Sequence, residues 1–241
     1  MTRRVLLKLS GEALMGKQEF GIDDEMLMRV AQEIKQAHQT GIEIGIVVGG
    51  GNLFRGVQGT AKGMDRTQAD YVGMMATIMN SIILQDALQR VECACHTFCT
   101  IEMPRVLDLF TARDAKKALA QGKVCIFAGG TGNPFFTTDS AAALKAAEIN
   151  AVEVLKATQV DGVYEADPRT HPQARRYTQL SFKTCLTQQL KVMDQSAFSI
   201  CQAEGIGLRV FDLHQVGHLA RALQGEALGT LVASELDTCY A

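Results

Sequence analysis

The sequence has no marked excess of charge of either sign and no run of basic residues. Its 241 residues carry a formal net charge of −2, and basic residues away from the N-terminus pair up only locally, as Lys116 with Lys117 and Arg175 with Arg176. A surface built to hold nucleic acid or anionic lipid needs a clustered positive charge. We therefore expect no nucleic acid and no membrane among the partners of this protein.

Long apolar runs, repeats and linkers are also missing. No window approaches the roughly 18 apolar residues of a membrane span, and the first residues lack the apolar core of a signal peptide. The cysteine count of seven is odd, which speaks against a complete disulfide framework. These features predict a cytoplasmic protein that forms a single domain over residues 1–241.

Short apolar runs alternate with helical patterns along the chain. We expect strands at residues 5–9, 43–48, 93–99, 124–128, 152–156 and 208–211, and helices at residues 26–38, 67–90, 111–120, 140–149, 181–190, 196–204 and 218–223. This alternation predicts an α/β fold, with a largely parallel sheet covered by helices on both faces. Ligands of such sheets bind at the carboxyl ends of the strands.

The most informative segment begins with the apolar run at residues 124–128 and ends at Asp139. The loop between them reads Gly-Gly-Thr-Gly-Asn-Pro-Phe-Phe-Thr-Thr, and an alanine-rich helix follows. Backbone N–H groups and hydroxyls in such a loop can surround an anion. Similar loops follow two earlier strands, at Ser10-Gly11 and at residues 49–52, so the sequence predicts a phosphate-rich ligand.

Two familiar nucleotide motifs are only partly matched. Residues 11–18 resemble a P-loop, but Gln18 replaces the hydroxyl residue that holds Mg²⁺. Residues 49–54 resemble a dinucleotide-binding turn, but Phe54 stands where a third glycine is required. Without a ligand this second loop would be a simple strand-to-helix turn. Arg55 favours a ligand, because a guanidinium beside a glycine loop can hold a phosphate with two hydrogen bonds.

Several other residues have both a structural and a functional interpretation. Three cysteines and His96 within residues 93–99 are either buried free thiols or a zinc site, and no second Cys/His pair supports zinc. Lys8, near the end of an apolar strand, either extends its stem to solvent or faces the ligand. Asp139 and Asp194 each open an expected helix, where an aspartate commonly serves as N-cap.

Five segments together resemble the bacterial uridylate kinases of the amino acid kinase superfamily, and the resemblance runs over residues 5–232. These segments are residues 8–14, 49–56, 131–139, 160–168 and 190–194. The resemblance implies a three-layer αβα sandwich around a mainly parallel sheet of about eight strands. It also implies a homohexamer that converts ATP and UMP to ADP and UDP, with Mg²⁺ carried by ATP.

The resemblance also assigns roles to residues. It implies that catalysis depends on Lys8, Arg55, Asp139 and Asp194. It implies ATP binding by Lys8, Leu9, Ser10, Gly11, Gly51, Arg55, Thr158, Tyr164 and Asp167. It implies UMP binding by Gly50, Arg55, Asp70, Thr131, Gly132, Asn133, Pro134, Phe135, Phe136, Thr137 and Thr138. An allosteric segment for activation by GTP corresponds to Gly16, Lys17, Gln18, Glu19, Phe20 and Gly21, and the resemblance separately implies UTP as an inhibitor.

The implied chemistry fits the residues. A phosphate acceptor is already anionic near neutral pH, so positioning and charge neutralisation carry catalysis and no general base is needed. One departure is Gln159, where the family commonly has lysine, and we expect it to alter nucleotide contacts. Residues 92–108 resemble the family only loosely.

Two other functions remain open at this stage. A related kinase of aspartate, acetylglutamate or carbamate would phosphorylate a carboxyl-type acceptor and should lack the Asn133–Phe136 segment. A catalytically inactive nucleotide sensor would keep the fold, but it would not need Lys8, Arg55, Asp139 and Asp194 together.

Overall fold

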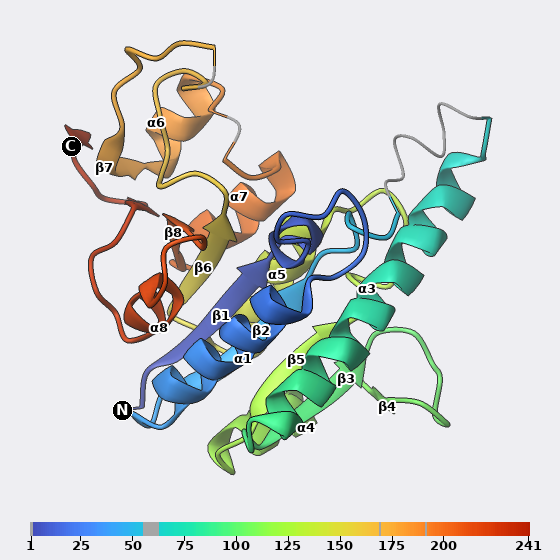
Figure 1. Cartoon of the computed structure of the whole chain (residues 1–241). Coiled ribbons are helices and arrows are strands. Elements are labelled where there is room, and N and C mark those ends of the chain that lie inside the picture. Colours follow the sequence, from blue (N-terminus) through green and yellow to red (C-terminus); the bar gives the residue numbers. More distant parts are fainter. Residues whose placement is uncertain (1, 55–62, 169, 191) are drawn as a thin grey trace.

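The described residues form one mixed sheet of ten strands. Figure 1 shows how the sheet and the helices are arranged. The computed structural model describes residues 2–54, 63–168, 170–190 and 192–241. Across the sheet the strand order is β10-β7-β9-β8-β6-β1-β2-β5-β3-β4, and within these residues only the β8–β9 and β7–β10 pairs are antiparallel. The strands are β1 (Arg4–Leu9), β2 (Glu43–Val48), β3 (Cys95–Cys99), β4 (Asp108–Leu109), β5 (Val124–Ala128), β6 (Glu153–Thr158), β7 (Tyr177–Ser181), β8 (Gly207–Asp212), β9 (Thr230–Ala233) and β10 (Cys239–Tyr240).

Helices cover the two faces of the sheet in separate sets. They are η1 (Gly11–Leu14), α1 (Asp24–His38), α3 (Arg66–Arg90), α4 (Ala112–Ala120), α5 (Thr138–Glu148), α6 (Phe182–Thr187), α7 (Gln195–Ala203) and α8 (His218–Leu223). One core lies under α1, α3 and α8, and the other lies under α4, α5, α6 and α7. Figure 1 shows α1 and α3 crossing in front of the strands.

The alternation of side chains along β1 determines which residues reach each core. Leu7 and Leu9 pack in the core under α1, whereas Leu6 packs in the core under α5. Because successive side chains of a strand point to opposite faces, Lys8 shares the α5 side with Leu6. The α/β prediction with helices on both faces is therefore confirmed.

The expected number of strands was too low, since the sheet has ten and not about eight. Two of the four strands that were not predicted, β4 and β10, contain only two residues each. The other two, β7 and β9, have polar residues and half-exposed positions, and neither contains an apolar run longer than three residues. The predicted strands at 43–48 and 124–128 have the observed bounds. The strand predicted at 93–99 starts two residues later, so Cys93 lies outside it.

The described chain contains no helix that is long and apolar enough to cross a membrane. All seven cysteines are free thiols. Among the described residues, no group of three or more His, Cys, Asp or Glu side chains is arranged to hold a metal ion, so the zinc alternative for residues 93–99 gains no support.

Candidate active site

Two lysines and one aspartate form a buried charged cluster where the central strands end. Lys8 of β1 pairs in register with Lys156 of β6, so the two side chains lie side by side. The Lys8 Nζ lies 2.9 Å from Asp139 Oδ1, and the Lys156 Nζ lies 2.7 Å from Asp139 Oδ2. Lys156 also donates to the backbone carbonyl of Val192. Two ammonium groups thus share one carboxylate, which leaves one net positive charge.

The environment of this cluster shifts its proton affinities. Burial raises the pKa of Asp139, but Lys8 and Lys156 outweigh burial and bring it below its ordinary value. For Lys156, burial lowers the pKa more than the Asp139 carboxylate raises it. The aspartate is therefore held ionised between the two lysines, where it offsets their mutual repulsion.

Asp139 is available for the lysines because another residue caps its helix. Thr137 is the N-cap of α5, and its hydroxyl accepts from the backbone N–H groups of Asp139 and Ser140. The alternative of Asp139 as a simple cap is thus wrong. Asp194, in contrast, is the N-cap of α7 and accepts from the Ala197 N–H at 2.8 Å.

Asp194 also joins the start of α7 to the start of α5. Its carboxylate accepts hydrogen bonds from Thr137, from Ser140 at 2.7 Å and from Ser196 at 2.8 Å. Burial raises the pKa of Asp194, and these hydrogen bonds together bring it below its ordinary value. The hydrogen bonds of Asp194 lie at the start of α5, where Asp139 is also located, and at the start of α7. Asp194 therefore supports the loop that leads to Asp139.

A cleft of about 280 Å³ extends to Thr138, the residue before Asp139. Its walls come from the loop after β2, the first turns of α3 and the loop after β5. Of the residues expected to bind UMP, the cleft is lined by Gly50, Asp70, Thr131, Asn133, Phe136, Thr137 and Thr138. Gly51, expected to bind ATP, lines it too. The residue after Thr138 is Asp139, so the cleft is continuous in sequence with the charged cluster.

Asp70 holds the tip of the loop after β5. Its carboxylate accepts from the Phe135 backbone N–H at 2.8 Å and from Arg66 Nε at 2.9 Å. Phe135 has a positive φ of 72°, which is unfavourable for a bulky side chain. The remaining predicted residues, Gly132 and Pro134, belong to the same loop. The predicted segment is therefore fixed on α3.

Glycines allow the loops after β1 and β2 to pack against each other. A Cβ on Gly11 would lie 2.4 Å from Asn52 Oδ1 and 2.7 Å from the Gly51 nitrogen, so no other residue fits there. Gly51 has open space on its Cα, whereas Gly50 packs against α3. The Ser10 hydroxyl caps η1, and the Leu9 carbonyl accepts from the Gly49 N–H. Two predicted phosphate loops are thus joined.

The residues expected around adenosine follow β6. Thr158 ends this strand, and its hydroxyl forms a tight turn with the backbone of Val160. Tyr164 donates to Asp161 at 2.7 Å, and Asp167 opens a turn through its backbone carbonyl. Gln159, the departure from the family pattern, is exposed at this end of the sheet.

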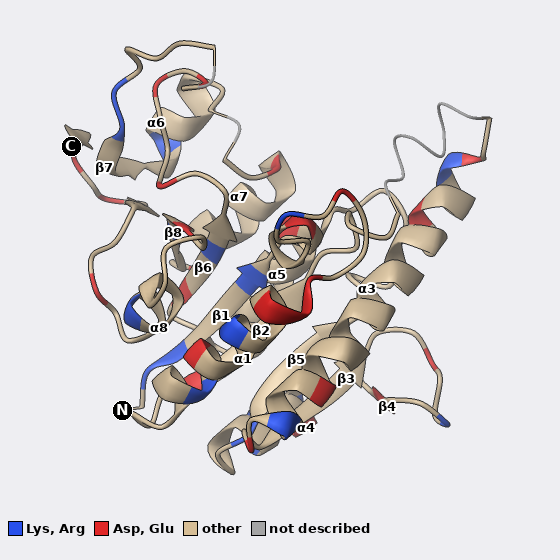
Figure 2. Ribbon diagram, viewed as in Figure 1, with Lys and Arg blue, Asp and Glu red and all other residues tan. Residues whose placement is uncertain are grey.

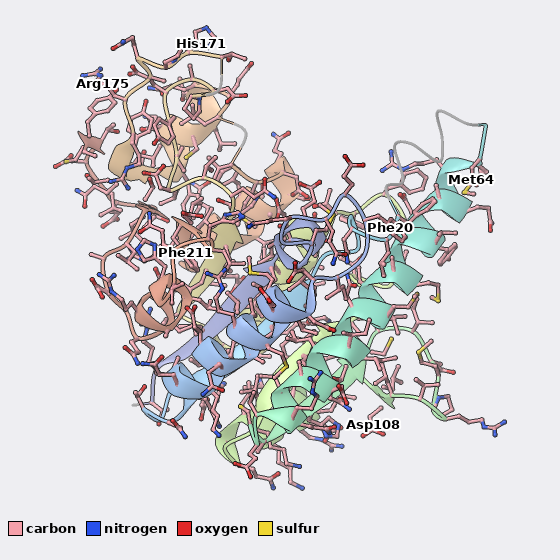
Figure 3. All side chains as sticks on the ribbon, in the orientation of Figure 1. Phe20, Met64, Asp108, His171, Arg175 and Phe211 are labelled. Atoms are coloured by element: carbon pink, nitrogen blue, oxygen red, sulfur yellow. The ribbon has the colours of Figure 1, made fainter. Side chains whose placement is uncertain are left out.

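The predicted allosteric segment forms an exposed loop after η1. Gly16 and Gly21 have positive φ angles, residues 16–20 are exposed, and Figure 3 labels Phe20 in this loop. Gly21 exchanges two hydrogen bonds with Asn52, from the Gly21 N–H to the Asn52 carbonyl and from Asn52 Nδ2 to the Gly21 carbonyl. The loop is therefore attached to the glycine turn after β2.

One predicted residue lies beyond the described residues and one site residue was missed. Arg55 belongs to the part that the structure does not describe. Lys156 was not among the expected site residues. A lysine directly after the apolar residues Val154 and Leu155 was a usable signal, and the equivalent position of Lys8 in β1 strengthens it.

Comparisons with known proteins agree with this geometry. The sequence model described as the amino acid kinase family matches residues 3–212. UMP kinase from Bacillus anthracis superimposes with a TM-score of 0.95 at 34% identity, over 99% of this chain and 98% of that one. UMP kinase from Ureaplasma parvum gives 0.92 at 36% identity, over 97% and 100% of the two chains. Uridylate kinase from Archaeoglobus fulgidus gives 0.73 at 30% identity, over 95% and 99%.

Proposed function

The chain belongs to the amino acid kinase family, and we propose that it is a nucleoside monophosphate kinase that transfers the γ-phosphoryl group of ATP to UMP. The observation that carries this proposal is the continuity between the cleft at Gly50, Asp70 and Thr138 and the charged cluster at Asp139. An acceptor cleft that is joined in sequence to a cluster of two lysines suits a reaction between two phosphates.

The acceptor half needs no base. The reaction forms a bond between a UMP phosphate oxygen and the γ-phosphorus, and it breaks the bond from that phosphorus to the oxygen of ADP. A UMP phosphate oxygen is already anionic, so the protein has to hold it in line. We assign UMP to the cleft, with Asp70 facing the ribose and the Thr131–Thr138 loop enclosing the base and the phosphate. Arg55 would contribute a further cation.

Charge neutralisation falls to Lys8 and Lys156. Negative charge spreads over the transferring group and the leaving oxygen, and two lysines held by one carboxylate present a net positive charge to it. The Asp139 carboxylate holds both ammonium groups at hydrogen-bonding distance. The positions of the two lysine side chains are therefore fixed before the substrates bind. Asp194 maintains the start of α5 through Thr137 and Ser140.

The donor half lies at the ends of β1 and β6. We propose that the triphosphate rests on the backbone of Ser10, Gly11 and Gly51, and that adenosine lies near Thr158, Tyr164 and Asp167. Mg²⁺ enters with the nucleotide as part of the MgATP substrate, where it neutralises phosphate charge. We also propose that the chain works as one domain over residues 1–241, and the single sheet under both halves of the site supports this.

We further propose that the protein self-associates as a homohexamer in which the outer face of α3 forms the two-fold contact between pairs of copies. Six apolar side chains of this helix are at least one-third exposed and share one side of it: Tyr71, Val72, Met75, Met79, Ile82 and Ile83. No charged residue occurs from 71 to 85, and Figure 2 shows the middle of α3 without charge. In a two-fold contact this face would pack against the same face of a second copy, and no like charges would meet there.

The exposed loop after η1 and the free cysteines bear on regulation and on cellular location. We propose GTP as an activator that acts through the exposed loop at residues 16–21, whose two hydrogen bonds to Asn52 connect it with the glycine turn, and UTP as an inhibitor. The free thiols are in keeping with a cytoplasmic protein.

An acceptor panel tests the proposed activity. Formation of ADP is followed with ATP, Mg²⁺ and one of UMP, CMP, dTMP, aspartate or acetylglutamate, with and without GTP and UTP. We expect UMP to be strongly preferred. Turnover of an amino acid in place of UMP would indicate a different member of the family, and binding of UTP or GTP without any turnover would indicate a sensor.

A further inference from the structure

The inner face of α3 carries polar residues that hold both substrate loops. Asp70, Thr77 and Asn80 are spaced seven and three residues apart, so they lie on the same side of the helix. Thr77 and Asn80 are 6% and 0% exposed. Asp70 accepts from Phe135, Thr77 accepts from the Gly129 N–H at 3.0 Å, and Asn80 donates to the Gly49 carbonyl at 2.7 Å. Each contact reaches a different point of the loops.

The loop after β5 depends on such contacts because its backbone is unusually free. Gly129, Gly130 and Gly132 all have positive φ angles. Glycine adopts positive and negative φ about equally well, so these residues do not by themselves fix the path of the loop. Gly129 is the root of this loop. Its N–H is held by Thr77, and its carbonyl accepts from Thr100 Oγ1 at 2.8 Å. The direction in which the loop leaves the sheet is therefore set at Gly129.

Thr77 has no hydrogen left to offer a ligand. Its hydroxyl donates to the Met74 carbonyl at 2.7 Å while its oxygen accepts from Gly129. Although Thr77 lines the cleft, its action on the loop passes through the Gly129 backbone. The residue is thus suited to positioning and not to chemistry.

Asn80 has the corresponding place beneath the glycine turn after β2. It forms a paired amide contact with Asn52, in which Asn80 Nδ2 donates to Asn52 Oδ1 at 2.7 Å and Asn52 Nδ2 donates to Asn80 Oδ1 at 3.2 Å. Its second N–H binds Gly49, and that of Asn52 binds Gly21. Every N–H of both amides has a partner, so this buried network fixes one arrangement.

We infer that Thr77 and Asn80 are positioning residues, Thr77 for the UMP loop and Asn80 for the glycine turn that both substrates share. This inference rests on the proposed function. The two residues have distinguishable effects: loss of the Thr77 contact acts on UMP alone, whereas loss of the Asn80 contact acts on UMP and ATP together.

Thr77→Val and Thr77→Ser form the matched test. Valine keeps the shape and removes the acceptor, which leaves the Gly129 N–H unpaired, and serine keeps the acceptor. We expect KM for UMP to rise about tenfold in Thr77→Val, with KM for ATP within about twofold of the wild type. Thr77→Ser should stay near the wild type. Ser81→Ala, which removes a hydroxyl that donates to the Thr77 carbonyl, is the control.

Asn80→Ala is the second variant, and here we expect both KM values to rise. Equal KM values for UMP in Thr77→Val and Ser81→Ala would overturn the role of Thr77, as would equal damage from valine and serine. Hydrogen exchange of the Gly129 amide gives a readout that needs no turnover, and it should accelerate in Thr77→Val but not in Thr77→Ser. If the wild type failed to phosphorylate UMP, the proposed function would fall while the exchange result would still decide the anchoring.

Discussion

Lys8 and Lys156 are direct neighbours in the parallel pairing of β1 with β6, and their ammonium groups contact the two different oxygens of the Asp139 carboxylate. Two like charges in a buried site repel unless an anion lies between them. The relationship explains why the aspartate is needed at the start of α5, and why the second lysine belongs to the site although it was not predicted.

Replacement of Lys156 should reduce turnover more than binding. Lys156→Met removes one cation that stabilises the transferring group, and loss of such a preorganised group typically costs on the order of 10²-fold in kcat. Lys183→Met, at an exposed position of α6, is the control and should have wild-type kinetics. Steady-state measurements with UMP and MgATP decide the matter, and a kcat within threefold of the wild type would remove Lys156 from catalysis.

The protein should lose stability in acid through Asp139. Its pKa is lowered in the folded state, so it stabilises the fold at pH values above the ordinary Asp pKa of about 3.9. This contribution is lost as the pH falls through the lower folded pKa. Urea unfolding between pH 3 and 6 should show a steeper decline for the wild type than for Asp139→Asn, which has no carboxylate to titrate. If the unfolding free energies of the wild type and of Asp139→Asn had the same pH dependence, Asp139 would not be the source of the acid sensitivity.

Glu33 should stabilise the fold without affecting catalysis. This buried glutamate of α1 accepts from the backbone N–H groups of Gly217, Leu219 and Ala220, at the start of α8, where Gly217 supplies no side-chain cap. Glu33→Gln loses the charge and part of the acceptor capacity, so we expect about 1–2 kcal/mol of destabilisation. The exposed Glu25→Gln is the control in urea unfolding, and KM and kcat should be unchanged in both variants.

A charge in the middle of the outer face of α3 should break the assembly. Met79 is 53% exposed in a single copy of the chain and lies at the centre of the apolar face. We expect Met79→Glu to yield a smaller species than the wild type in sedimentation velocity, because two glutamates would meet in a two-fold contact. Val216→Glu, at a position that is 80% exposed in the loop before α8 and not on α3, should leave the mass unchanged. An unaltered mass for Met79→Glu would exclude this face.

The central part of the fold was predictable because its strands are continuous apolar runs. Residues 43–48 and 124–128 are buried on both faces, and such strands leave a clear pattern. The edge of the sheet was less predictable. Tyr177–Ser181 has exposed positions and Cys239–Tyr240 is too short for any period, so their place in the sheet depends on their neighbours.

Site residues that follow strands were predictable for the same reason, whereas their contacts were not. A glycine loop after an apolar strand marks the binding edge, and Ser10, Gly50 and Thr131 lie at such loops. That Asp139 contacts Lys156 depends on how α5 packs over β1 and β6, which the local pattern does not record. The polar residues inside α3 were similarly hidden, since Thr77 and Asn80 in an apolar helix gain a meaning only from the loops that they touch.

The most direct test of the account is to identify the product with labelled ATP. With γ-labelled ATP, Mg²⁺ and UMP, the wild type should place the label on the β-phosphate of UDP, and Lys8→Ala should form UDP at least about 10²-fold more slowly. Label recovered as inorganic phosphate or on an amino acid, with UMP unchanged, would contradict the account.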